Sequence, residues 1–331
     1  MKTFRRFSNH FFTVLVGGLT AAAVLLLAFV LFFIVKEALP LFDTVGVSDF
    51  LLGQKWMPVD YTGVTSFGIF NFIAATVYVS LTGLVLAAGI GLGTAVFLAF
   101  QATPRMRTVL YPLIDLLAGI PSVIYGFIGL SVLVKLFLKA GVHTGSCVLA
   151  AGILLAVMLL PYLVSSCSDT MLKERNKYLE ASAALGISDW YAAATMILPA
   201  SMPNILMSMV LAVGRAMGET MAVMMVMGNA NLFPKLLGKS ESIASVIALE
   251  MGTAVYGSPH YHALYAAGMV LVLLLLLINL GIHLLRRCLM EENLTFRAEQ
   301  STDAARNSGT SAAQKKTVNA QNTTGKGENV R

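Results

Sequence analysis

The stretch Phe11–Val35, which reads FFTVLVGGLTAAAVLLLAFVLFFIV, decides the class of fold. It is 25 consecutive residues without a charged side chain. About 20 apolar residues, at 1.5 Å of helical rise each, cross the hydrocarbon core of a bilayer. The stretch therefore predicts a membrane-spanning helix. It is longer than the roughly 7–15 apolar residues of a secretion signal and no small-residue cleavage site follows, so we expect a retained anchor.

The composition of the whole chain agrees with a membrane protein. Of its 331 residues, 57% are apolar and only 12% are charged, and the mean hydropathy is +0.76. A soluble domain carries roughly a quarter charged residues, which its surface needs. The composition therefore excludes soluble enzymes, nucleic-acid-binding proteins and coiled coils. Cytoplasmic loops of membrane proteins collect Lys and Arg, which accounts for the net charge of +6.

Five further apolar runs follow the first one. They are Phe67–Phe100, Leu116–Val134, Cys147–Ser168, Asn204–Gly228 and Ala263–Leu285. The sequence thus predicts an all-α, polytopic integral membrane protein with six transmembrane helices in the cytoplasmic (inner) membrane.

The distribution of basic residues predicts the orientation of these helices. With the N-terminus inside, the inner segments hold 16 of the 23 Lys and Arg residues and the outer segments hold 6, while Arg215 lies within a span. Because Lys and Arg are retained on the cytoplasmic side, we expect both termini to be cytoplasmic.

Three parts of the chain follow from this reading. Residues 1–66 hold a cytoplasmic N-terminus, the first anchor helix and an outer loop; residues 67–287 form the domain that holds the other five spans; residues 288–331 form a cytoplasmic tail. From Ala298 onward the tail has no aromatic residue, and its only large apolar residues are Val318 and Val330. Such a composition cannot offset the entropy of ordering, so we expect this tail to be largely disordered.

The inner segment between the fourth and fifth runs, about residues 169–203, has a helical pattern. It predicts a helix over Lys173–Leu185, a turn at Gly186, and a second helix over Asp189–Leu198 capped by Ser188. Pro199 and Pro203 are expected to end that helix before the fifth span begins. The result is a helix–turn–helix at the inner membrane face.

Two charges stand inside the fifth apolar run. Arg215 lies near its middle, where a charge costs about 2.5–3.5 kcal/mol on insertion scales. Glu219 follows four residues later, so on a continuous helix the two side chains can pair. One reading is a self-neutralising pair that locks the bundle; the other is an anion path. Buried ion pairs rarely stabilise more than apolar packing does, and a guanidinium matches the oxygens of phosphate, which favours the anion path.

Residue patterns for enzymatic or metal chemistry are lacking. Cys147, Cys167 and Cys288 fit no disulfide framework or metal spacing, and no Ser/His/Asp arrangement is discernible. His260 and His262 have no carboxylate or thiol near them in the sequence, so we expect loop histidines. We therefore expect no catalytic residue, no cofactor and no metal.

The inner segment resembles the EAA loop of ABC importer permeases. The resemblance rests on Glu180-Ala181-Ser182, on Gly186 and on Leu198-Pro199. It implies a short coupling helix that seats in a groove of a cytoplasmic ATPase, with small side chains allowing close docking. Two departures are mild: Ser182 replaces the second Ala, and Met196 stands at the usual Ile position.

Two further segments are similar to phosphate-specific permeases of the PstC type. They are Gly214–Val223, GRAMGETMAV, and Ala118–Gly126, AGIPSVIYG; Ile243–Ala248 fits as well. The resemblance covers roughly residues 67–287 and implies that they form a permease domain with the type I ABC importer transmembrane fold. Beyond the fold, the resemblance implies import of inorganic phosphate. It also implies that Arg215, Glu219 and Thr220 lie on the substrate path, and that a partner hydrolyses the ATP.

The same resemblance implies the partners. They are a sister permease of the PstA type, two copies of an ATPase, and a periplasmic phosphate-binding protein. Three alternatives remain open at this point. They are a permease for sulfate, molybdate or tungstate, an ATP-independent secondary anion transporter or channel, and a structural membrane scaffold.

Overall fold

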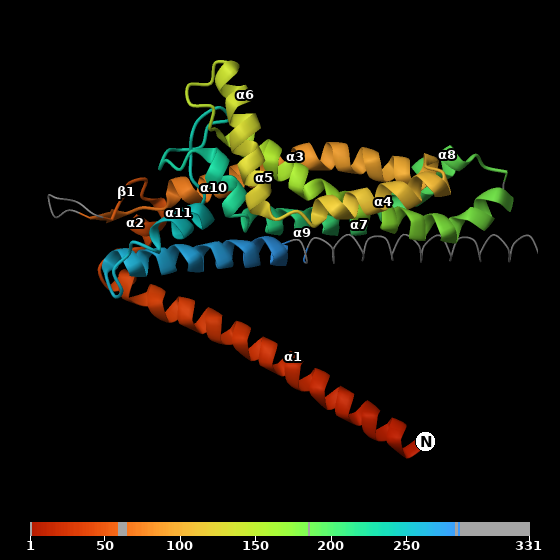
Figure 1. The fold of residues 1–331 in the computed structure, drawn as a ribbon, viewed down its shortest axis with the longest axis horizontal. Coiled ribbons are helices and arrows are strands. Elements are labelled where there is room, and N and C mark those ends of the chain that lie inside the picture. The colour runs from red at the N-terminus through yellow and green to blue at the C-terminus, as the bar shows by residue number, and fades with distance from the viewer. Residues whose placement is uncertain (1, 59–64, 185, 282–283, 285–331) are drawn as a thin grey trace, which may run out of the picture. The chain divides into compact units, whose positions relative to one another are not determined.

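The computed structural model describes residues 2–58, 65–184, 186–281 and 284. The chain divides into a unit Met1–Asn279 and a unit Leu280–Arg331, and nearly all described residues belong to the first (Figure 1). The predictions for the tail and for Cys288 lie outside the described residues.

Six helical segments are long and apolar enough to span a membrane, which confirms the predicted number. They are Phe12–Asp43, Phe70–Gln101, Ser122–Lys139, Val148–Tyr178, Asp189–Met217 and Pro259–Gly281. Most spans differ from the prediction in their bounds, and the differences at the third and the fifth span have local causes described below.

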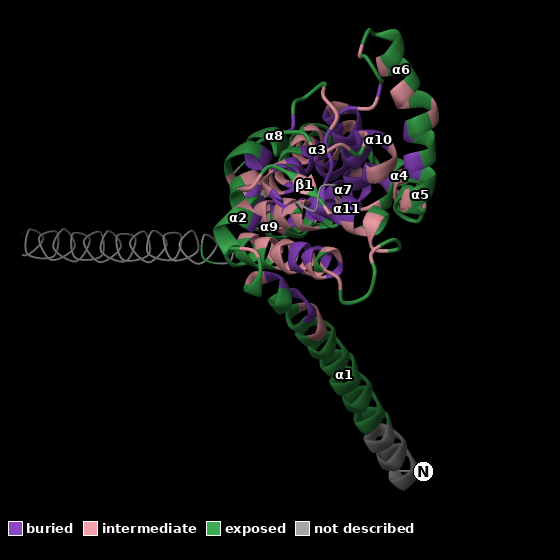
Figure 2. Ribbon diagram, turned by 90° about the vertical axis from the view of Figure 1, so that its left-hand side faces the viewer, coloured by how far each residue is buried: buried purple, intermediate pink, exposed green. Residues whose placement is uncertain are grey.

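The N-terminal part combines one long helix with a small ordered segment. Helix α1 (Lys2–Ala38) is followed by the 3-10 turn η1 (Leu39–Asp43), by α2 (Val47–Leu52), and by the antiparallel strands β1 (Trp56–Met57) and β2 (Ser66–Phe67). From Phe12 to Leu31 the apolar side chains of α1 are exposed, as a lipid-facing helix requires (Figure 2). Its C-terminal end is anchored, since Ala38 is fully buried.

The core lies between three long helices. Helix α3 (Phe70–Val96) ends in the π-helical turn η2 (Phe97–Gln101), and it packs against α7 (Val148–Ala184) and α9 (Leu198–Met217) (Figure 1). Helices α3 and α7 approach closely because two glycines face the contact. A Cβ on Gly83 would lie 2.8 Å from Leu155 Cβ, and one on Gly152 would lie 2.7 Å from Thr82 Cγ2.

The third span is displaced from its predicted position by a break in the chain. Helix α4 (Pro104–Ala118) ends at Gly119, and α5 (Ser122–Ile128) starts after Pro121 and continues through η3 (Gly129–Leu133) into α6 (Val134–Lys139). Proline lacks an N–H and disfavours a helical residue before it, so the apolar run cannot form one helix. The predicted span Leu116–Val134 was therefore wrong at its start.

The fifth span begins earlier than predicted. Helix α8 (Asp189–Ala192), the π-helical turn η4 (Ala193–Ile197) and α9 follow one another without a gap, so Pro199 and Pro203 do not end a helix here. Pro199 lies in the first turn of α9, and we attribute its tolerance to the wider π-helical turn before it, which removes the usual ring clash. The first predicted inner helix is likewise the end of α7 and no separate element.

Beyond α9 the chain is again broken. Helix α10 (Met221–Met227) follows after three non-helical residues, and α11 (Ile243–Glu250) precedes the last span. The predicted fifth run, Asn204–Gly228, is thus two helices, and the break falls within the segment Gly214–Val223.

Candidate anion path and coupling segment

Arg215 lies in the last turn of α9, beside the helix break. Gly218 is the C-cap of α9, and Glu219 and Thr220 stand between the two helices. A cation at a helix C-terminus and an anion before a helix N-terminus each interact favourably with the helix dipole. The break therefore tolerates both charges.

The predicted pairing of Arg215 with Glu219 is wrong. Four-residue spacing brings side chains together only on a continuous helix, and α9 ends between them. In the described part of the chain no ion pair joins the two. Glu219 Oε1 instead accepts a hydrogen bond from the Ala222 backbone N–H at 3.3 Å, and the Thr220 hydroxyl donates to the Gly218 carbonyl at 3.3 Å.

Arg215 is exposed in the single chain. No described carboxylate lies within ion-pair distance of it, and its guanidinium is close enough to Tyr162 on α7 to act on that side chain electrostatically. A charge with no counter-charge, on a helix of an otherwise apolar bundle, is available to a ligand or to another subunit.

A polar cavity of about 340 Å³ lies between α7 and α9. Its lining from α7 is Tyr162, Ser166, Thr170, Lys173 and Glu174, and its lining from α9 is Asn204, Met207, Ser208 and Leu211. The hydroxyls of Ser166 and Ser208 lie 2.6 Å apart and connect the two helices. The Thr170 and Ser208 hydroxyls donate to the Ser166 and Asn204 carbonyls, so the donors left for an anion in this cavity are the Lys173 ammonium and the Asn204 amide.

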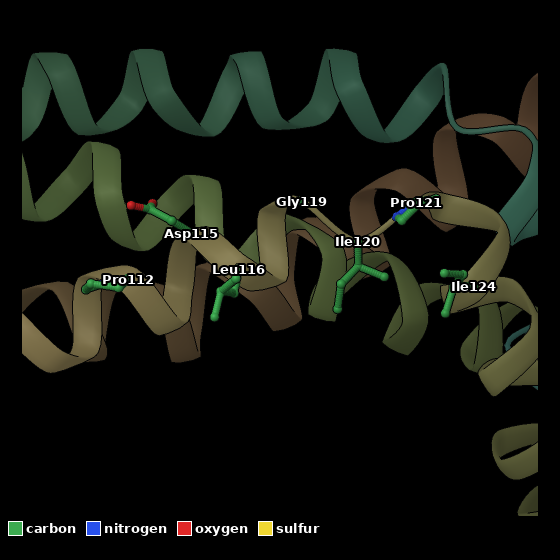
Figure 3. A pocket seen from close by; sticks show the side chains of 7 residues that line it. All are labelled: Pro112, Asp115, Leu116, Gly119, Ile120, Pro121 and Ile124. Carbon is green, nitrogen blue, oxygen red and sulfur yellow. The ribbon is translucent and has the colours of Figure 1, made fainter.

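A larger hollow of about 660 Å³ lies where α4 meets α5 (Figure 3). Its seven lining residues come from the segment Pro112–Ile124, and Asp115 is its one charged member. It has no cationic lining residue, whereas the cavity between α7 and α9 has Lys173, and the carboxylate of that cavity, Glu174, is paired with Lys177. The smaller cavity between α7 and α9 is therefore the better candidate for an anion path.

The two sequence segments that resemble PstC-type permeases contact each other. Helix α5 packs against α10, and a Cβ on Gly126 would lie 3.1 Å from Ala222 Cα. The Tyr125 hydroxyl donates to the Leu117 carbonyl at 2.9 Å across the α4–α5 break. The two helix breaks are thus parts of one packed structure, which the sequence did not reveal.

The predicted turn at Gly186 is confirmed, because its φ is +65°. The Ser188 hydroxyl caps α8 by accepting from the Tyr191 N–H at 3.4 Å, also as predicted. Ser182 is buried, Leu198 begins α9, and Pro199 follows in its first turn. Glu180 and Ala181 lie in the last two turns of α7, with side chains outside the described set.

Two arginines contact the π-helical turn η2 near this segment. Arg107 and Arg175 both donate to the Ala99 carbonyl, at 2.9 and 3.2 Å. Arg175 also lies 4.0 Å from Asp189 at the start of α8. The π-helical turn η2 is thereby connected to residues 169–203, the segment predicted to couple to the ATPase.

Several carboxylates near the ends of the first and last spans have partners that the sequence did not reveal. Glu250 Oε2 lies 2.7 Å from His260 Nε2 and accepts from Trp56 Nε1 at 2.9 Å. Burial, together with the nearby Glu250, raises the pKa of Glu241 to about 7. His262 lies 3.8 Å from Glu37, so both histidines have a carboxylate neighbour, contrary to expectation. The partners are distant in sequence, and spacing could not reveal them.

Comparisons with known proteins agree with these features. Residues 89–289 match the family described as binding-protein-dependent transport system inner membrane component. The chain is 35% identical over 275 residues to a probable ABC transporter permease, YqgH, of Bacillus subtilis, covering 80% of this chain and 88% of that protein. It is 34% identical to the phosphate transport system permease protein PstC of Xylella fastidiosa, covering 80% and 86%.

Among solved structures, a chain of the inward-facing MetNI methionine ABC transporter has the same fold. The TM-score is 0.53 at 16% identity, over 66% of this chain and 94% of that one. The helices with their two breaks thus form the transmembrane fold of an ABC importer. The chain belongs to the family of binding-protein-dependent transport system inner membrane components, and it is a membrane-spanning transport subunit rather than an enzyme.

Proposed function

We propose that this chain is the permease subunit of an ATP-driven importer of inorganic phosphate. The observation that carries the proposal is the exposed Arg215 at the α9–α10 break, one helical turn beyond Leu211, which lines the cavity that holds Lys173 and Asn204. A guanidinium offers the paired donors that match two phosphate oxygens. Relatives named as phosphate transport permeases, at 31–34% identity, support phosphate as the anion.

The proposal assigns roles to the segments around the cavity. Arg215, together with Glu219 and Thr220, lies on the substrate path at the interface with a sister permease. Residues 169–203 dock onto a cytoplasmic ATPase, of which two copies serve the two permeases. A periplasmic binding protein delivers phosphate from outside. Both termini are cytoplasmic, because the inner segments carry most of the Lys and Arg residues.

The experiment is uptake of labelled phosphate in cells that lack their own high-affinity system and express this chain with its three partners. We expect uptake that excess unlabelled phosphate abolishes and that sulfate, molybdate and tungstate leave in place. Stronger competition by one of those oxyanions than by phosphate would assign the permease to that anion instead.

Dependence on ATP separates an importer from a secondary transporter. Purification of the chain in mild detergent should bring an ATPase with it, and uptake should stop when that ATPase loses its nucleotide site. Uptake that persists without the ATPase would contradict the proposal.

A further inference from the structure

The polar side chains of the α7–α9 cavity form a continuous stripe. On α7 they stand at Tyr162, Ser166, Thr170 and Lys173, spaced by three or four residues and thus on one helix face. The stripe ends at Lys173, about 16 Å from Tyr162 at 1.5 Å per residue. A row of this length crosses half of a membrane.

The facing helix carries a matching row. Asn204, Ser208 and Arg215 lie four and seven residues apart on α9, which is again one face. Arg215 lies close enough to Tyr162 to act on it electrostatically, and Ser208 Oγ lies 2.6 Å from Ser166 Oγ, so the two rows run antiparallel. Arg215 therefore marks one end of the stripe, and Asn204 lies toward the end with Lys173.

The inner end of the stripe carries an available positive charge. No described carboxylate pairs with Lys173, whereas the neighbouring Glu174 is held by Lys177 with an N–O distance of 2.6 Å. Within the described contacts the exposed Asn204 side chain makes no hydrogen bond either. An ammonium and a free amide donor thus meet at this end, and the adjacent carboxylate is neutralised.

We propose that this stripe is the inner half of the anion's path and that Lys173, with Asn204, is a second anion-binding position after Arg215. The inference rests on the proposed function, since it takes the anion to move from Arg215 toward the coupling segment. Conduction requires sites that bind well enough to be occupied and weakly enough to be left. Two positions linked by a row of polar side chains meet this requirement better than one strong site.

The first test removes the charge at the inner end. In the assembled transporter, Lys173→Gln should lower the maximal rate of labelled-phosphate uptake roughly tenfold. A change of this size corresponds to the loss of about one charge-assisted hydrogen bond to the anion. The phosphate concentration for half-maximal uptake should stay the same, because capture takes place at the binding protein. Lys173→Arg should restore most of the rate.

The matched control is Arg105→Gln. Arg105 is an exposed cation on the same side of the membrane that does not line the cavity. Its loss changes the net charge equally and should leave uptake unchanged. Membrane abundance and ATPase co-purification, measured for every variant, separate a folding defect from a transport defect. Equal uptake by Lys173→Gln and Arg105→Gln would overturn the inference.

The second test probes occupancy directly. Thr170→Cys places a cysteine in the stripe, and Asp169→Cys places an exposed cysteine at the same depth on another face of α7. The wild-type chain gives the background reactivity of the native cysteines. A negatively charged thiosulfonate should modify Thr170→Cys, and phosphate should slow this reaction during ATP-driven turnover. Phosphate should not affect Asp169→Cys.

The outcomes distinguish the inference from the proposed function. If the wild-type transporter carries another oxyanion and that anion protects Thr170→Cys, phosphate is wrong and the path is right. If the wild-type transporter carries phosphate while phosphate protects neither cysteine, the path is wrong and the function stands.

Discussion

At the scale of single residues, the isolation of Arg215 is the main feature of this chain. It lies at a helix C-terminus, where a cation is favourable, and no described carboxylate pairs with it. The helix end stabilises Arg215 and leaves its five donors free. An anion at this position would therefore not have to displace a counter-ion.

The first prediction concerns the charge and the planar geometry of the Arg215 guanidinium. Arg215→Gln should lower phosphate uptake at least about tenfold, the scale of one charged hydrogen bond. Arg215→Lys should retain only part of the activity, since an ammonium lacks the planar fork. Labelled-phosphate uptake at equal membrane abundance measures both, and normal uptake by Arg215→Gln would leave only a structural role.

The second prediction concerns Glu219, which stands just before the N-cap residue Thr220 and accepts a hydrogen bond from the Ala222 N–H in the first turn of α10. Glu219→Gln keeps an acceptor oxygen and should leave most of the uptake, whereas Glu219→Ala loses this hydrogen bond, which is typically worth about 1 kcal/mol at a helix N-terminus. Thermal unfolding of the purified complex should therefore separate the two variants. An equal loss of uptake in both, without loss of stability, would show that the charge itself acts in transport.

At the scale of elements, helix ends determine where charges stand. The sequence predicted the apolar runs, the turn at Gly186 and the Ser188 cap, because each has a local signal. It could not place the α9–α10 break, since glycines spaced four residues apart, as Gly214 and Gly218 are, also occur within continuous membrane helices. Pro199 was misleading for a related reason, because a π-helical turn accommodates it.

The third prediction tests the turn. Gly186 has a φ of +65°, and a Cβ at this position would meet no atom within 4 Å, so Gly186→Val strains only the backbone, by about 1–2 kcal/mol or more. It should weaken ATPase co-purification and uptake while the spans remain inserted. Gly252→Val is the control, since that site is also open and lacks a positive φ. Normal ATPase binding by Gly186→Val would contradict the coupling role.

The fourth prediction follows from the buried Glu241. Burial raises its pKa from 4.5 to about 7, so the folded state binds a proton more tightly than the unfolded chain. The stability of the fold should therefore fall as pH rises from about 4.5 to 7 and level off above that. Glu241→Gln should unfold at a higher temperature than wild type at pH 8 and at nearly the same temperature at pH 4.5.

Asp43→Asn provides the control for this measurement, because it removes an exposed carboxylate outside the candidate site. Its unfolding curve should follow that of the wild type at every pH. A Glu241→Gln variant with the same pH dependence as the wild type would show that Glu241 is not the group responsible.

At the scale of the whole molecule, six spans could be predicted because apolar length is a local property of the sequence. The cavity between α7 and α9 could not be predicted, because Ser166 and Ser208 come together only through packing. The cluster of Trp56, Glu250 and His260 joins residues 194 positions apart and left no trace in residue spacing. Local signals therefore predicted the elements, and tertiary contacts decided the site.

The fifth prediction concerns the tail beyond Arg297, whose composition predicts no fold. A chain lacking residues 298–331 should transport phosphate at the wild-type rate once membrane abundance is matched. A loss beyond about tenfold would show that the tail contacts a partner.

The central claim is that this chain converts ATP hydrolysis by a partner into movement of phosphate past Arg215. The most direct measurement is uptake of labelled phosphate into proteoliposomes that hold the complete complex, with the binding protein outside and ATP inside. We predict uptake that requires both ATP and the binding protein and that falls at least about tenfold in Arg215→Gln, with the ATPase still bound. Uptake without ATP, or equal uptake by Arg215→Gln, would contradict the account.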